Sequence, residues 1–83
     1  MADVKLYGAD WCPLTTRARA HLEKIGVQYE YIDVEQDEAA SKWVKDQNNG
    51  KEKKPTIDVD GQILSEPTNA ELDQALSAKG LLA

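Results

Sequence analysis

Two reactive side chains are almost absent from this 83-residue sequence, which contains one cysteine, Cys12, and one histidine, His21. A single cysteine cannot form a disulfide within the chain, so hydrophobic packing must hold the fold together. A cluster ligated by four protein thiolates is excluded for the same reason, and we expect no metal site. His21 lies more than two helical turns beyond Cys12, so we expect a solvated surface histidine and not a base for the thiol.

Positive charge and long hydrophobic runs are also scarce. The chain carries 10 lysines and arginines against 15 aspartates and glutamates, a formal net charge of −5, whereas nucleic acid and anionic lipid attract basic surfaces. No apolar run approaches the roughly 20 residues of a membrane-spanning helix. A strand-like pattern already begins at Val4, which leaves no room for a signal peptide. We therefore expect a reduced, cytoplasmic setting, with neither nucleic acid nor a membrane as partner.

Strand and helix patterns alternate along the chain, and no repeat or linker interrupts them, so residues 1–83 are expected to form one domain. The turn signals are Gly26, the break at 48–50 and the Asp-Gly pair at 60–61. Thr68 and Glu71 have the spacing of a capping box, which marks the start of a last helix. The predicted elements are strands 4–7, 29–34, 56–59 and 62–64, helices 13–25 and 35–47, and the helix that begins near Thr68.

Apolar residues at helical spacing mark the faces that we expect to be buried. Trp43 belongs to such a face, so we interpret it as a core residue and not as a stacking platform for a ligand. The inward residues are Leu14, Ala18, Leu22 and Ile25 in the first helix, Ala40, Trp43, Val44 and Gln47 in the second, and Leu72, Ala75 and Leu76 in the third.

Cys12 stands where the first loop meets the first helix. Pro13 suits the first helical position, which places Cys12 at or beside the N-cap. Free N–H groups and the positive end of the helix dipole would then face the sulfur, which lowers the pKa of a thiol and favours the reactive thiolate. Asp10 opposes this effect, and we expect water to reach the sulfur because no apolar run encloses it. The alternative interpretation is that Cys12 is a small buried hydrophobic residue.

With a Cys-Pro pair after the first strand, this order of elements resembles the glutaredoxins of the thioredoxin fold, and the tail looks most like bacterial members of the mycoredoxin type. The resemblance spans residues 4–76. It implies an α/β thioredoxin-like fold of order βαβαββα, with a four-stranded mixed sheet flanked by three helices. The matching pieces are Leu6-Tyr7, Trp11-Cys12-Pro13, Gly26-Val27-Gln28-Tyr29, Asp33, Pro55-Thr56 and Glu66-Pro67-Thr68-Asn69-Ala70-Glu71-Leu72.

The resemblance also implies roles for individual residues. Cys12 would be the catalytic nucleophile, and Pro55 would be a cis-proline that faces its sulfur. Lys54 would offer its backbone N–H and C=O to an extended thiol substrate. Thr68 and Asn69 would hold a substrate carboxylate, because free N–H groups at a helix start bind anions. The rest of the active-site motif would be Trp11, Pro13, Leu14 and Thr15.

Several positions depart from the family pattern. Thr15 stands where dithiol members have a second cysteine, so no internal CxxC disulfide can form. Ala9 stands where many members have a lysine, which leaves a preference for glutathione open. A compensating positive charge could come from Lys51, Lys53 or Lys54, although these residues could equally form a solvated basic loop. The other departures are Leu14 for tyrosine, Lys53-Lys54 for threonine-valine and Ser65-Glu66-Pro67 for a glycine pair.

We therefore expect a monothiol thiol–disulfide oxidoreductase that reduces mixed disulfides between proteins and a small thiol through Cys12. Glutathione or a similar thiol would be the co-substrate, no cofactor would be bound permanently, and the protein would act as a monomer. The alternative is a redox-inactive binding module of the same fold. A third possibility is an iron–sulfur carrier that uses Cys12 and glutathione from two chains, but Pro13 and Leu14 differ from the Gly-Phe of that subclass.

Overall fold

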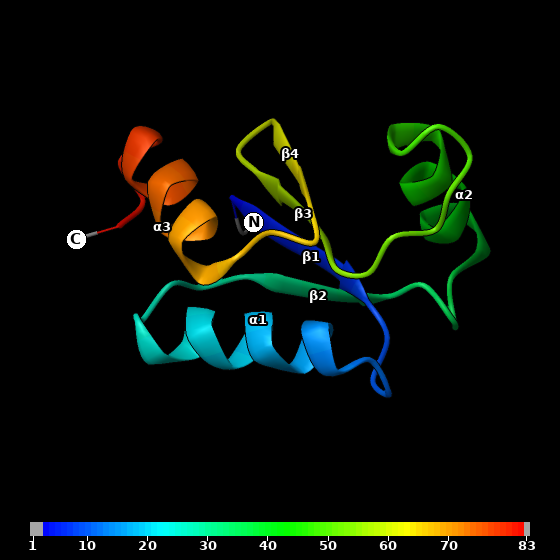
Figure 1. The fold of residues 1–83 in the computed structure, drawn as a ribbon, viewed down its shortest axis with the longest axis horizontal. Coiled ribbons are helices and arrows are strands. Elements are labelled where there is room, and N and C mark those ends of the chain that lie inside the picture. Colours follow the sequence, from blue (N-terminus) through cyan, green and yellow to red (C-terminus); the bar gives the residue numbers. More distant parts are fainter. Residues whose placement is uncertain (1–2, 83) are drawn as a thin grey trace.

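The computed structural model describes residues 3–82. Strands and helices follow the predicted βαβαββα order, which can be traced by colour in Figure 1. The elements are β1 (Val4–Gly8), α1 (Pro13–Lys24), β2 (Glu30–Asp33), α2 (Glu38–Gln47), β3 (Thr56–Val59), β4 (Gln62–Ser65) and α3 (Asn69–Ala78).

The four strands form one mixed sheet in the order β2-β1-β3-β4. Central β1 runs parallel to β2 and antiparallel to β3, so that Leu6 is paired with Tyr31 on one side and with Ile57 on the other. This is the predicted arrangement, and it places the carboxyl end of β1 next to the loop that carries Cys12.

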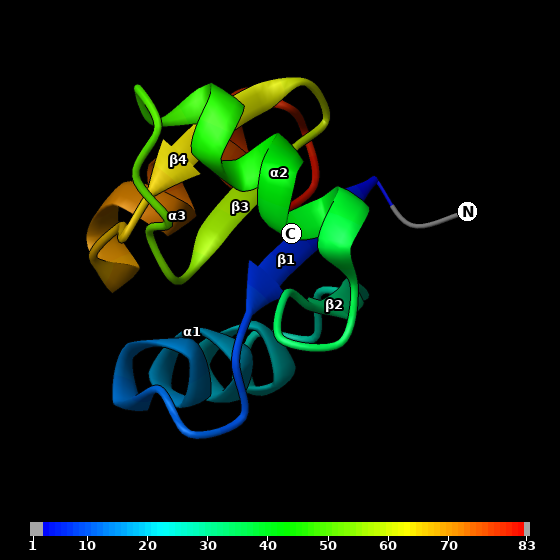
Figure 2. The same cartoon turned by 90° about the vertical axis from the view of Figure 1, so that its right-hand side faces the viewer.

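Helices cover both faces of this sheet. Leu22 of α1 and Leu76 of α3 pack on the face that carries Leu6 and Ile57, and all four side chains are fully buried. On the opposite face, Val44 of α2 belongs to a smaller hydrophobic cluster. Its other members are Val34, Ala40, Tyr7, Ile32 and Trp43. Figure 2 shows α2 on its own side of β1, away from α1. Trp43 is thus a half-buried core residue, as predicted.

The turn signals are confirmed, but α2 begins later than the predicted residue 35. The Asp33 carboxylate accepts the Glu35 N–H at 2.9 Å and the Asp33 carbonyl accepts the Gln36 N–H at 3.1 Å, so the chain turns before the helix can start. Asp37 is the N-cap, and its side chain accepts the Ala40 N–H at 3.0 Å. The capping box between Thr68 and Glu71 is present at the start of α3.

The prediction that His21 is a solvated surface histidine is wrong. Its Nε2 lies 2.6 Å from Oδ1 of Asp73, and only 13% of its side chain is exposed. The reason is that α1 and α3 share one face of the sheet, so the flank of α1 that bears His21 meets α3. Within residues 3–82, no helix has both the length and the apolar character needed to cross a membrane.

Candidate active site at the start of α1

Cys12 is the N-cap of α1, and Pro13 occupies the first helical position. The Cys12 N–H bonds to the Ala9 carbonyl at 3.1 Å, and the Cys12 carbonyl accepts the Thr16 N–H at 3.1 Å. The sulfur makes no capping hydrogen bond of its own. The backbone geometry therefore leaves the sulfur in front of the first turn, as the sequence predicts.

The first turn of α1 directs its free donors at this sulfur. Pro13 has no N–H, so the groups of this turn that favour the thiolate are the N–H groups of Leu14 and Thr15 and the hydroxyl of Thr15. Burial is the largest influence on the pKa of the Cys12 thiol and raises it, but these donors and the Lys54 ammonium outweigh burial and lower the pKa overall. A lowered pKa increases the thiolate population, which is the nucleophilic form.

Solvent access to Cys12 differs from the expectation. The residue is only 8% exposed, so the sulfur is largely covered and not open to water on the loop side. The alternative interpretation of Cys12 as a buried residue is thus correct for its exposure, but the lowered pKa separates it from an inert core cysteine. The donors of Leu14 and Thr15 and the Lys54 ammonium favour the thiolate despite this burial.

The segment before β3 lies across from the sulfur. The Lys54–Pro55 peptide bond is cis, and the Cys12 Sγ lies 3.7 Å from the Lys54 carbonyl oxygen. Pro55 is fully buried, and its own carbonyl accepts the Glu66 N–H at 2.8 Å. These contacts connect the nucleophile to the segment that leads into α3. Cys12, Lys54 and Pro55 are therefore neighbours. The resemblance implies that these three residues belong to one site.

Lys54 also supplies the positive charge of the site. Its ammonium lies 3.5 Å from Glu35 and 3.9 Å from Glu52, and 4.7 Å from the ring centroid of Trp11. The Trp11 indole N–H donates to Glu35 at 3.1 Å, although the residue remains 66% exposed. Among the three candidate lysines, Lys54 is the one whose charge lowers the pKa of Cys12. No sequence signal points to Glu35 or Glu52, because their contacts with Lys54 depend on how separate segments of the chain converge.

Asp10, which we expected to oppose the thiolate, is engaged elsewhere. The Tyr31 hydroxyl donates to its carboxylate at 2.7 Å, and Arg19 approaches the same carboxylate at 4.0 Å while lying 3.9 Å above the Tyr31 ring. These contacts fasten the loop before Cys12 to β2 and α1. The sequence did not reveal this network, since its members come from three separate segments.

Thr68 and Asn69 stand at the start of α3, where the resemblance places a carboxylate-binding group. Two donors there are already used: the Thr68 N–H bonds to the Glu71 carboxylate at 2.8 Å, and the Glu71 N–H bonds to the Thr68 hydroxyl at 3.1 Å. These contacts with Thr68 hold the pKa of Glu71 below its usual range. A substrate carboxylate would therefore meet the N–H groups of Asn69 and Ala70 beside a charge of its own sign.

No candidate metal centre accompanies the thiol: the part of the chain that the structure describes holds no group of three or more His, Cys, Asp or Glu side chains arranged to bind a metal ion.

Comparison with known proteins agrees with this geometry. The model of the glutaredoxin family matches residues 4–64. Mycoredoxin 1 of Corynebacterium glutamicum is 38% identical over 79 residues, which cover 94% of this chain and 98% of that protein.

Solved structures show the same fold. A mutant of the thioredoxin-like protein BC3987 superposes with a TM-score of 0.82 at 26% identity, covering 93% of this chain and 97% of the other. The glutaredoxin from Archaeoglobus fulgidus has a TM-score of 0.75 at 22% identity, covering 92% of this chain and 87% of the other. The second likeness concerns the fold alone.

Proposed function

Because the chain belongs to the glutaredoxin family, we propose that it is a monothiol thiol–disulfide oxidoreductase that acts through Cys12 on mixed disulfides between proteins and a small thiol. One observation carries the proposal. The pKa of the Cys12 thiol is lowered by donor groups of Leu14 and Thr15 at the start of α1. No second cysteine exists in the sequence, so both halves of the cycle must use Cys12.

The cycle balances with one cysteine. The Cys12 thiolate attacks the small-thiol sulfur of the mixed disulfide, a bond forms between these two sulfurs, and the protein thiolate leaves. A second molecule of the small thiol, as thiolate, then attacks the small-thiol sulfur bound to Cys12, which releases the small-molecule disulfide and restores the Cys12 thiolate. One free molecule of small thiol is consumed in each cycle: its sulfur and the small-thiol sulfur of the mixed disulfide end as the small-molecule disulfide, and the protein sulfur is released as a thiol.

The charges of the site bear on which small thiol is used. Two groups that would attract a carboxylate, the Lys54 ammonium and the Thr68 N–H, are already engaged by Glu35 and Glu71 respectively. Glutathione carries two carboxylates, whereas a sugar thiol of the mycothiol type has none. The proposed co-substrate is therefore of the mycothiol type, with glutathione a weaker one, and the proposed setting is a reducing cytoplasm in which the protein acts as a monomer.

The test is an exchange assay with one model protein carrying either a mycothiol or a glutathione mixed disulfide. Unchanged protein should release the protein thiol from both, faster from the mycothiol adduct, and Cys12→Ser should reduce the rate to background. Thr16→Ser, which keeps the hydroxyl that bonds to the Cys12 carbonyl at 3.3 Å, is the matched control and should retain activity. Exchange with neither adduct would favour a redox-inactive binding module.

A further inference from the structure

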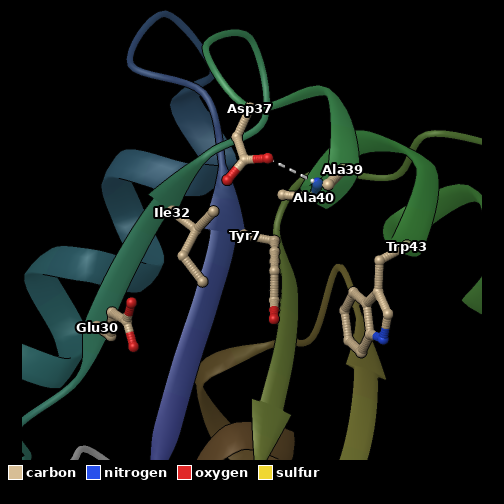
Figure 3. Close-up of a pocket in the computed structure, with 7 residues that line it drawn as sticks. All are labelled: Tyr7, Glu30, Ile32, Asp37, Ala39, Ala40 and Trp43. Atoms are coloured by element: carbon tan, nitrogen blue, oxygen red, sulfur yellow. Dashed lines mark hydrogen bonds between the residues drawn. The ribbon is translucent and has the colours of Figure 1, made fainter.

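A groove of ≈ 330 Å³ lies on the face of the sheet that α2 covers, opposite to the face that packs on α1. Tyr7, Glu30 and Ile32 line it from β1 and β2, and Asp37, Ala40 and Trp43 line it from α2 and its N-cap (Figure 3). Its volume is at the lower end of the range of about 300–1,000 Å³ that is usual for small-ligand sites. Cys12 is not among its lining residues.

Aromatic rings form one side of this groove. The rings of Tyr7 and Trp43 stack with centroids 4.4 Å apart and planes inclined by 27°. Figure 3 shows Tyr7 standing between Trp43 and Ile32, so one face of its ring is covered by the indole and the other is turned toward Ile32 and the groove. The face of an aromatic ring is its negative region, which attracts cations.

The charged groups that line the groove are both acidic. Glu30 and Asp37 contribute carboxylates, and no basic side chain joins them in the lining. Within the described part of the chain, neither forms an ion pair shorter than 4.0 Å. The same carboxylates, with Asp58 and burial, raise the pKa of the Tyr7 phenol, burial having the largest influence. A negative potential therefore extends over the aromatic wall.

The cations nearest in the fold form no ion pair with the carboxylates of the groove among residues 3–82. Lys5 is paired in register with Glu30 on β2 and with Asp58 on β3, but it forms none of the ion pairs found among residues 3–82. Lys42 on α2 is held by Asp46 at 3.0 Å. The lining thus carries two carboxylates and no basic side chain, an excess of negative charge that favours a cation over an anion beside the Tyr7 ring.

We propose that this groove binds a small organic cation, an ammonium group on a short aromatic or aliphatic body, with its body against Tyr7 and Ile32 and its charge attracted by the field of Glu30 and Asp37, which lie on either side of Ile32 (Figure 3). The two carboxylates set the sign of the charge, and the apolar residues between them select a body that is not strongly hydrated. The site is independent of the thiol chemistry at Cys12.

The experiment titrates the full chain with phenethylammonium and, as a neutral analogue of the same shape, phenethyl alcohol. Binding is followed by the NMR shifts of the Trp43 indole N–H and the Ala40 amide. Phenethylammonium should shift both signals saturably and bind at least about threefold more tightly than the alcohol, because ion pairs and cation–π contacts at exposed sites each add modestly to affinity.

Substitutions should show which carboxylates attract the ligand's ammonium group. Glu30→Gln and Asp37→Asn should each weaken binding about two- to fivefold, and Asn preserves the helix cap that Asp37 provides. Glu38→Gln is the matched control, since Glu38 is exposed in the same first turn but does not line the groove. Cys12→Ser should leave the affinity unchanged, which separates this proposal from the one on Cys12.

Three results would overturn the proposal. The alcohol could bind as tightly as the ammonium compound, Glu38→Gln could weaken binding as much as Glu30→Gln, or the shifts could spread over the surface without saturation.

Discussion

Both the backbone N–H and the hydroxyl of Thr15 lower the pKa of the neighbouring Cys12 thiol. The side chain is fully buried, and its oxygen also accepts the Ala9 N–H at 3.4 Å. Thr15 occupies the position where dithiol relatives have their second cysteine, so this chain has a hydrogen-bond donor in place of a resolving thiol. The residue contributes directly to the ionisation of the nucleophile.

Thr15→Val should therefore raise the pKa of Cys12, because the variant keeps the shape and the backbone donor but loses the hydroxyl donor to the thiolate. The rate of alkylation by iodoacetamide, followed against pH, should have its inflection at higher pH than in the unchanged protein. Thr16→Val is the control, since Thr16 bonds to the Cys12 carbonyl and not to the sulfur. Equal profiles for Thr15→Val and the unchanged protein would show that the hydroxyl plays no part.

Glu35→Gln should move the alkylation inflection in the opposite direction. The change removes a negative partner from the Lys54 ammonium while Gln can still accept the Trp11 indole N–H, so Lys54 would stabilise the thiolate more strongly. The effect should shrink in 1 M salt, where the screening length is only about 3 Å. Glu38→Gln, on the same loop-to-helix junction, should leave the profile as it is. A shift to higher pH in Glu35→Gln would contradict this account of the charges.

Glu71→Gln should strengthen the binding of glutathione by the start of α3. Gln still forms a capping box, so the helix keeps its cap, while the negative charge that competes with a substrate carboxylate is removed. An NMR titration should show larger amide shifts at Asn69 and Ala70 at the same glutathione concentration. If amides near Cys12 respond but those of Asn69 and Ala70 do not, the carboxylate is held elsewhere.

Gly8→Ala should destabilise the fold by about 1–3 kcal/mol, the usual cost of overpacking. A Cβ atom at Gly8 would lie 2.5 Å from Cγ2 and 2.6 Å from Oγ1 of Thr15, closer than real Cβ contacts. Urea unfolding measures the cost, and the same change made in a Thr15→Ala background should cost less, because both crowding atoms are then absent. Equal costs in the two backgrounds would mean that the contact does not determine the loss.

The order of elements and the strand pairing could be predicted because each element carries its own local signal. Gly26 and Gly50 have the positive φ angles of +74° and +86° that such break positions require, and the Asp-Gly pair at 60–61 turns the hairpin. The start of α2 could not be predicted, since the turn before it depends on the Asp33 side chain, which competes with a longer helix.

The central residues of the candidate site could be predicted from the sequence, but the residues that contact them could not. Cys12, Pro13 and Lys54-Pro55 follow from the motif and from the resemblance, and the structure brings them together. The partners of Lys54 and Asp10 come from other segments, so only the tertiary structure reveals that Glu35 and Tyr31 engage them. Burial of His21 against α3 was missed for the same reason.

The most direct test of the monothiol cycle is an intact-mass measurement of the protein after reaction with one equivalent of a small-thiol disulfide near pH 7. The account predicts a mass gain of one small-thiol unit on Cys12, with mycothiol disulfide reacting faster than glutathione disulfide, and a return to the original mass when the free thiol is added. Cys12→Ser should gain no mass. A chain that forms no adduct with either disulfide, or an adduct that free thiol does not release, would contradict the proposed function.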